Sequence, residues 1–217
     1  MTTTQPILQP QTQEKFAAVC PPRRRSFPTW KFPLLIPWWI AVFWKKTVSW
    51  GWQQRIKSKL ASIGDGCRLR GTSLITAPDR LWLGDNVHIG DNSTLRAEGG
   101  LQIDSHAHLA RNVVIYTINH NYEGTRIPYD ETVVAKPVKI GIAAWIGINV
   151  IILPGVEIGE GAIIGAGSVV THSIPALSIA AGNPCRVVKQ RDSESYYQRK
   201  SAKNFGGVNG IEYRDRT

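Results

Sequence analysis

Large aliphatic residues recur at every sixth position through most of the chain. From Ile63 to Leu81 the step is regular, and its phase then shifts by two residues at Leu83 and again at Ile103. Downstream the step holds without exception at Ile140, Ile146, Ile152, Ile158, Ile164 and Val170. Small or β-branched residues lie four positions after the aliphatic ones, at Val87, Ser93, Ala107, Val113, Val150, Val156, Ala162 and Ser168. A six-residue period matches neither a 3.6-residue helix nor simple strand alternation.

The period predicts an all-β fold in which a short strand and a corner repeat. Three units make one triangular coil of about 18 residues, and neighbouring coils pair as parallel strands about 4.8 Å apart. The aliphatic side chains point inward, and the glycines that follow four of them are expected to allow the corner turn. The spacing is too regular for the short strands of a sandwich. We count about five coils, over residues 63–80, 83–100, 103–137, 140–157 and 158–175.

The third coil is interrupted by a polar segment, residues 117–137, which contains Gly124, Pro128 and Pro137. A long loop in a repeat protein is seldom needed for stability, because the coils bury their core without it. His120 lies at the start of this loop. A histidine there is either a solvated loop residue or a group that exchanges protons near neutral pH.

The positive charge belongs to the N-terminal part of the chain. The net charge of the 217 residues is +10, yet residues 1–60 hold ten basic residues and one acidic residue, Glu14. Six of the eight tryptophans also lie in this part. We therefore expect a disordered basic leader over 1–25, a Trp-rich amphipathic arm over 26–60, the repeat domain over 61–190 and a short polar tail over 191–217.

The arm favours contact with an anionic membrane surface, because tryptophan prefers the headgroup region. The alternative is packing on the domain or on a neighbouring subunit. The apolar run at 32–44 has two prolines and is shorter than the roughly 20 residues that span a bilayer. A nucleic-acid partner is not expected, since basic and aromatic residues are not spread over a folded face. The three cysteines show no paired spacing, which favours a reducing cytoplasmic setting, and the arm would then place the protein peripherally at the inner membrane face.

The segment "WIGINVIILPGVEIGEGAIIGAGSVVTHSIPALSIAAGNPCRVVKQR", residues 145–191, resembles the end of the hexapeptide-repeat acyltransferases. The galactoside, maltose and related sugar O-acetyltransferases are the most similar members. The resemblance covers roughly residues 60–190 and implies a left-handed parallel β-helix, a homotrimer and acetyl transfer from acetyl-CoA to a sugar hydroxyl. Together with the arm, it implies a sugar or lipid-linked glycan acceptor in surface polysaccharide or glycolipid biosynthesis.

The resemblance also assigns site residues. It implies that His120 is the general base, which would take the proton of the attacking hydroxyl. Asn92 falls at an acceptor-binding asparagine and Trp145 at a tryptophan beside the active site; the simpler alternatives are a corner asparagine and a packing tryptophan. A carboxylate often orients such a histidine. The sequence does not choose among four candidates: Glu98, Glu123, Asp130 and Glu131.

In this family coenzyme A lies in a groove between subunits. The implied contacts are Ala166, Thr171, His172, Arg186 and Lys189, although Arg186 and Lys189 also suit a basic cap after the last coil. The chain has His172 where the family has lysine, and Ile148 where the most similar members have serine. No metal is expected.

Other functions share this fold. Xenobiotic and serine acetyltransferases differ in the acceptor, and a tethered β-helix scaffold would have no catalysis. A zinc-dependent γ-type carbonic anhydrase would use stacked histidines, for which His88, His108 and His106 are available.

Overall fold

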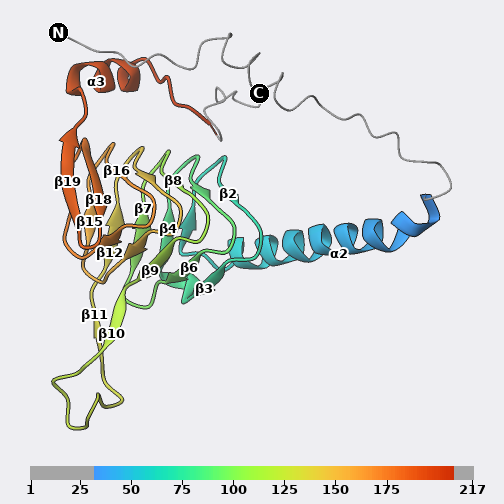
Figure 1. Ribbon diagram of the computed structural model, residues 1–217, viewed down its shortest axis with the longest axis horizontal. Helices are drawn as coiled ribbons and strands as arrows, with labels where there is room; N and C mark the ends of the chain where they lie inside the picture. Colours follow the sequence, from blue (N-terminus) through green and yellow to red (C-terminus); the bar gives the residue numbers. More distant parts are fainter. Residues whose placement is uncertain (1–31, 208–217) are drawn as a thin grey trace, which may run out of the picture. The chain divides into compact units, whose positions relative to one another are not determined.

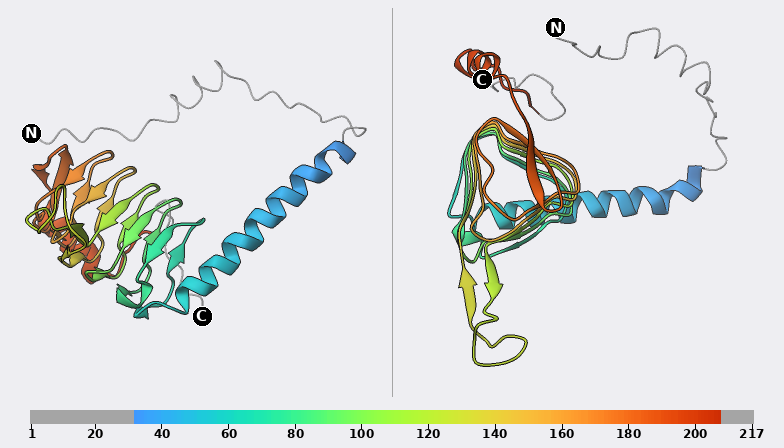
Figure 2. Two further views of the ribbon diagram at one scale, coloured as in Figure 1. Left: turned by 90° about the horizontal axis from the view of Figure 1, so that it is seen from below. Right: turned by 60° about the vertical axis from the view of Figure 1, so that its left-hand side comes forward.

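Three largely parallel sheets form the three sides of a triangular solenoid (Figures 1 and 2). Sheet 1 contains β1 (Ser62–Ile63), β4 (Leu81–Leu83), β7 (Leu101–Ile103), β12 (Val138–Ile140) and β15 (Glu157–Ile158). Sheet 2 contains β2 (Arg68–Leu69), β5 (His88–Ile89), β8 (His108–Leu109), β13 (Trp145–Ile146), β16 (Ile163–Ile164), β18 (Ser178–Gly182) and β19 (Cys185–Gln190). Sheet 3 contains β3 (Leu74–Thr76), β6 (Thr94–Arg96), β9 (Val114–Tyr116), β14 (Ile151–Ile152) and β17 (Val169–Val170).

The computed structural model describes residues 32–207, with side chains from residue 39 onward. The chain divides into two units, Met1–Lys45 and Lys46–Thr217. The leader expected over 1–25 and the last ten residues of the tail lie outside the described residues.

The predicted coils are confirmed, and their core is a stack of aliphatic side chains. Ile89, Leu109, Ile146 and Ile164 occupy successive paired positions of sheet 2, and each is at most 1% exposed. The small residues four positions later are buried as well. Five coils are complete, and a sixth begins with the pairing of Ile158 with Ile174 and of β18 with β16. The six-residue period therefore arises because each side of each coil buries one large side chain.

The phase shifts come from longer strands in sheet 1. Leu81 and Leu83 both face the core, as do Leu101 and Ile103 in the next coil. Ile63 pairs with Leu83, which in turn pairs with Ile103, so the early coils are 20 residues long. The added pair of residues gives those coils a second inward position on one side.

The role predicted for the glycines after the aliphatic residues was wrong. None of Gly141, Gly147, Gly159 and Gly165 has a positive φ. A Cβ on Gly147 would lie 2.7 Å from the backbone nitrogen of Ala166 in the next coil, so glycine is needed there for close approach. The left-handed corner residue comes two positions later, as at Asn149 (φ 58°) and Gly161 (φ 65°).

Helix α2 (Phe32–Lys57) forms from the Trp-rich arm. Its apolar residues do not gather on one face, which differs from the predicted amphipathic arrangement. Near its end, Trp52 and Ile56 pack against the hydrophobic core of the solenoid. No helix in the described part of the chain is long and apolar enough to cross a membrane.

The end of the solenoid is closed by the segment after the last coil. Strand β19 pairs antiparallel with β18, and helix α3 (Ser193–Ser201) follows. The side chain of Asp192 caps α3 by accepting a hydrogen bond from the Ser195 backbone N–H. Tyr196 is buried, and Lys200 forms an ion pair with Glu160 at 2.6 Å. This helix forms from part of the polar tail predicted over 191–217.

Candidate functional site

The loop predicted at 117–137 leaves the solenoid as a two-stranded hairpin (Figure 1). Strands β10 (Ile118–His120) and β11 (Val133–Ala135) pair antiparallel, with His120 opposite Val133. The hairpin is anchored at its base by Thr117, which is fully buried. Its hydroxyl donates to the Arg96 carbonyl and accepts from the Gly99 backbone N–H. The base of the hairpin is thus fixed to the rigid coil.

The distal loop of the hairpin is organised by one carboxylate, Asp130. It accepts hydrogen bonds from the backbone N–H groups of Thr125 (2.7 Å) and Thr132 (2.9 Å), and from both threonine hydroxyls. The Asp130 side chain fills the space beside Gly124, where a Cβ would overlap a carboxylate oxygen. The Thr132 and Thr125 hydrogen bonds lower the pKa of Asp130 to about 2.

His120 is exposed, and its ring is stacked on Tyr129. The ring centroids are 3.9 Å apart and the planes differ by 16°. The backbone N–H of His120 donates to the Asn119 side chain at 2.9 Å. Tyr129 directly precedes Asp130. The hydrogen bonds accepted by this carboxylate therefore hold in place the tyrosine on which the His120 ring is stacked.

None of the four candidate carboxylates makes a hydrogen bond or ion pair with His120 within residues 39–207. Glu98 is held by Arg96 at 2.8 Å, and Glu131 pairs with Arg126 at 3.0 Å. Burial acts to raise the pKa of Glu98, but hydrogen bonds, that of Arg96 foremost, bring it below its usual value. Among the described residues, a tyrosine ring rather than a carboxylate supports the imidazole of His120.

Asn92 lies in a ladder of corner asparagines. Its amide donates to Asn112 at 3.0 Å, and the amide of Asn112 donates to Asn149 at 2.9 Å. All three have φ between 56° and 59°. This is the arrangement expected for a corner residue, and it leaves the part of Asn92 in acceptor binding as a prediction.

The predicted cofactor residues are spread over three regions. Ala166 lies at the corner between sheets 2 and 3. Thr171 and His172 follow β17 at the corner between sheets 3 and 1, where the threonine hydroxyl and His172 Nδ1 are 2.8 Å apart. Arg186 and Lys189 are exposed on β19.

Apart from Arg186 and Lys189, the predicted residues form two groups in different parts of one chain. His120 belongs to the hairpin between β9 and β12, at the corner of sheets 3 and 1, where Thr171 and His172 also lie. Asn92 and Ala166 lie at the corner of sheets 2 and 3, and Trp145 lies on the outer face of sheet 2. Viewed along the coil axis, the hairpin leaves a single corner of the triangle (Figure 2, right).

A groove of about 780 Å³ runs along the outer face of sheet 2. Trp145, which is 57% exposed, lines it together with Ile148 and Ile163. The lining also includes Arg70, His88, Asp91, His106, His108, Arg111, Arg191 and Phe205. This groove contains one of the predicted acceptor residues.

The three histidines of the groove favour the neutral state. Burial, with the charges of His108 and nearby arginines, lowers the pKa of His88 to about 4. Burial also lowers the pKa of His106 and His108. The rings of His88 and His108 lie 5.7 Å apart and meet edge to face at 62°, while His106 stacks on Phe205 at 3.8 Å. No group of three side chains suited to a metal occurs among the described residues, so the carbonic anhydrase alternative gains no support.

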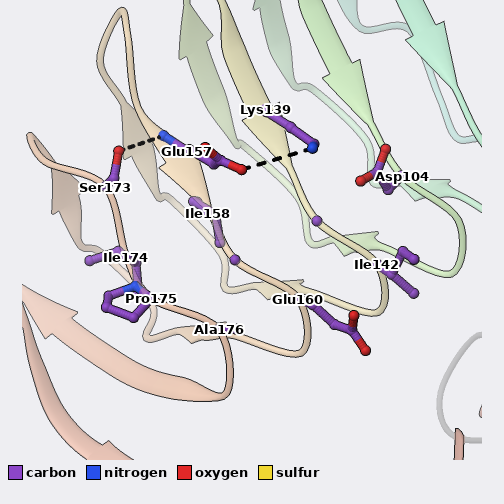
Figure 3. Close-up of a pocket in the computed structure, with 12 residues that line it drawn as sticks. Asp104, Lys139, Ile142, Glu157, Ile158, Glu160, Ser173, Ile174, Pro175 and Ala176 are labelled. Atoms are coloured by element: carbon purple, nitrogen blue, oxygen red, sulfur yellow. Dashed lines mark hydrogen bonds and ion pairs between the residues drawn. The ribbon is translucent and has the colours of Figure 1, made fainter.

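A second hollow, of about 590 Å³, lies on sheet 1 and contains none of the predicted site residues (Figure 3). The side chains of Asp104, Glu157 and Glu160 line it, with Lys139 3.9 Å from Glu157. Its acidic lining is unsuited to an anionic cofactor.

Tyr129, Arg70 and Arg111 were not identified from the sequence. Tyr129 lies nine residues from His120 in an aperiodic loop, and only the hairpin register brings the two rings together. Arg70 and Arg111 belong to different coils. The six-residue spacing places both just beyond strands of sheet 2, so the repeat alone predicts that they lie along the same side of the solenoid.

The chain is similar in sequence to known transferases. Residues 137–172 match the family described as bacterial transferase hexapeptide (six repeats). A protein of Escherichia coli (strain K12) assigned as the colanic acid biosynthesis acetyltransferase WcaF is 31% identical over 71% of this chain and 85% of its own length. A protein of Saccharomyces cerevisiae assigned as an acetyltransferase is 35% identical over 68% of this chain and 76% of its own length.

Solved structures share the fold. A galactoside acetyltransferase in complex with coenzyme A superposes with a TM-score of 0.61 and 29% identity, over 66% of this chain and 72% of that one. A maltose O-acetyltransferase from Clostridium difficile 630 gives a TM-score of 0.57 and 31% identity, over 65% and 75%. These likenesses confirm the predicted left-handed parallel β-helix.

The hydrogen bonds of Asp130 predict how the hairpin loop responds to pH. The pKa of Asp130 is lower in the folded protein than the ordinary value of about 3.9, so the carboxylate's contribution to order is complete above that value. It is lost as the pH falls through about 2. We expect Asp130→Asn to speed hydrogen exchange of the Thr125 and Thr132 amides by at least about tenfold at pH 5.

The same exchange measurement supplies the controls. Wild-type protection at these amides should persist at pH 4 and fall towards pH 2, relative to the core amide of Ile146. Glu123→Gln changes a carboxylate of the same hairpin whose side chain makes no hydrogen bond to another described residue, and it should have no effect. Unchanged exchange in Asp130→Asn would contradict the role given to this carboxylate.

Proposed function

Since this chain belongs to the hexapeptide-repeat transferase family of acetyltransferases, we propose that it transfers the acetyl group of acetyl-CoA to a sugar hydroxyl, with His120 as the general base. The observation that carries the proposal is the exposed imidazole held on Tyr129 at the outer end of the paired strands of an anchored hairpin. The likeness to a galactoside acetyltransferase in complex with coenzyme A supports both the donor and the acceptor class.

The reaction is a direct transfer within a ternary complex. Neutral His120 accepts the proton of the acceptor hydroxyl as its oxygen bonds to the thioester carbonyl carbon. This attack forms a tetrahedral intermediate. When its carbon–sulfur bond breaks, the imidazolium gives the proton to the departing thiolate of coenzyme A. Stacking on Tyr129 limits the orientations of the ring, which lowers the entropic cost of alignment.

We propose further that a neighbouring subunit completes the site in a homotrimer. Asn92, Trp145 and Ala166 lie at another corner from His120, so one copy would supply the base and the next the groove. The outer face of sheet 3 presents Leu74 (58% exposed) and Ile151 in one row. An exposed apolar row of this kind supports contact with a second copy.

For the groove and the cofactor residues we propose the roles that the family resemblance implies. Trp145 would offer its exposed aromatic face to a sugar ring, and Asn92 would offer its amide group to a sugar hydroxyl. Ala166, Thr171, His172, Arg186 and Lys189 would contact acetyl-CoA, the last two as cations for its phosphates. The colanic acid assignment of the Escherichia coli relative supports a role in surface polysaccharide biosynthesis.

His120→Ala should lower transfer by at least about a hundredfold while acetyl-CoA binding is retained, because only the proton acceptor is removed. Thiol release from acetyl-CoA in the presence of sugar acceptors measures the first quantity, and a binding titration measures the second. Equal turnover in the wild type and His120→Ala would exclude His120 as the base.

Mixed oligomers test the shared site. His120→Ala and Trp145→Ala are each expected to be weakly active alone. If subunits are dissociated, mixed in equal amounts and reassembled, roughly a quarter of the sites should combine an intact His120 with an intact Trp145. Activity should rise accordingly. No recovery, with reassembly confirmed by mass measurement, would place the whole site within one chain.

The exposed tryptophans of α2 support peripheral membrane contact and hence a lipid-linked acceptor. Trp44 and Trp50 are 61% and 64% exposed, and Lys45 and Lys46 lie between them. The full chain should bind vesicles of equal parts phosphatidylglycerol and phosphatidylcholine. Trp44→Ser/Trp50→Ser should weaken this binding at least about tenfold. Trp82→Ser, on sheet 1, is the matched control; failure of the wild type to bind at physiological salt would refute the contact.

A further inference from the structure

We infer that the sheet 2 groove binds the phosphate of a phosphate-linked sugar, with Arg70 and Arg111 as the phosphate ligands and Trp145 against the sugar. The inference rests on the proposed acetyl transfer, because it concerns the acceptor of that reaction. It specifies an acceptor that carries an ester-linked phosphate or diphosphate rather than a free sugar.

Within the described residues, the two arginines are charged groups without a partner. Neither side chain makes a hydrogen bond or ion pair with another residue of the described chain, and both line the groove. Arg96 and Arg191, by contrast, are held by partners. Arg96 binds Glu98 and Arg191 donates to the Gly161 carbonyl while lying over Tyr196. A guanidinium offers a planar set of donors that suits phosphate oxygens.

The remaining charges of the groove do not neutralise these arginines. Asp91 is the acidic residue of the lining, and its carboxylate is turned towards Gly71, where a Cβ would lie 2.6 Å from it. No ion pair links Asp91 to either arginine among residues 39–207. Because burial keeps the histidines neutral near pH 7, the groove has a net positive charge that comes from arginine.

The length of the groove also favours an extended acceptor. Arg70 follows β2 in the first coil, Arg111 follows β8 in the third, and Ile163 lies in the fifth. At about 4.8 Å per coil, the lining extends over about 19 Å, which exceeds one sugar ring. Trp145 lies in the fourth coil, between the arginines and the corner that carries Ala166. A sugar on Trp145 would therefore have the donor on one side and its own phosphate on the other.

Binding to His120→Ala protein tests the inference without turnover. We expect galactose 1-phosphate to bind at least about tenfold more tightly than galactose. In Arg70→Gln/Arg111→Gln this difference in affinity should disappear. Arg199→Gln, an exposed arginine on α3 outside the groove, should retain it. The difference in affinity between galactose 1-phosphate and galactose should also shrink as the salt concentration is raised, since the contacts are between exposed charges.

Three results would overturn the inference. The first is equal affinity for galactose and galactose 1-phosphate. The second is a higher affinity for galactose 1-phosphate than for galactose that persists in Arg70→Gln/Arg111→Gln. The third is weaker acetyl-CoA binding in that double variant, which would assign the arginines to the donor phosphates. Circular dichroism of the double variant establishes that a loss of binding is not a loss of fold.

Two further probes identify the source of the phosphate. Uridine diphosphate galactose represents a nucleotide-linked acceptor, and prenyl diphosphate galactose in detergent micelles represents a lipid-linked one. Binding of each probe should depend on the two arginines. The probe that binds more tightly indicates whether the natural acceptor is linked to a nucleotide or to a lipid. Transfer assays on the wild type are read separately: arginine-dependent binding with no transfer would refute the proposed acetyl transfer and leave the phosphate site standing.

Discussion

Stacking of aliphatic side chains from one coil onto the next is the interaction on which the whole structure depends. A single coil has strands of two or three residues and cannot bury its own inward side chains. No inward position is buried by its own coil alone: Leu109 is covered only because Ile89 and Ile146 lie on either side of it. Stability is therefore a sum of contacts between neighbouring coils. The rigid wall that results fixes the height of every corner residue along the coil axis.

The corners of successive coils line up as ridges along the solenoid, and these ridges carry candidate functional residues. Each corner needs a backbone conformation that most residues avoid, and asparagine satisfies it at 92, 112 and 149. Their side chains then hydrogen-bond to one another along the ridge. Close approach of successive coils requires glycine just before the corner, as at Gly147. Structural demands thus account for most residues of a corner, and the exceptions, such as Arg111, are the places to seek chemistry.

The sequence predicted the coils well because burial of one aliphatic residue per side leaves a strict period. It also located the extruded loop, since the period stops there. It did not assign the glycines correctly, because close approach and positive φ both favour glycine and only coordinates separate them. The contact between His120 and Tyr129 was not predictable, since an irregular loop has no period that fixes its register. Asp130 was considered as a partner of the histidine; the structure gives it a role one residue removed, in holding the loop that carries Tyr129.

The hairpin contributes nothing to the aliphatic stack, and Thr117 joins it to the coil at one buried point. Its sequence is therefore nearly free of the packing constraints that govern the solenoid. Substitutions between residues 121 and 132 that spare Gly124, Tyr129 and Asp130 can alter the surroundings of the histidine without a matching loss of fold stability. The other residues of this segment can therefore diversify while His120, Tyr129 and Asp130 keep their arrangement.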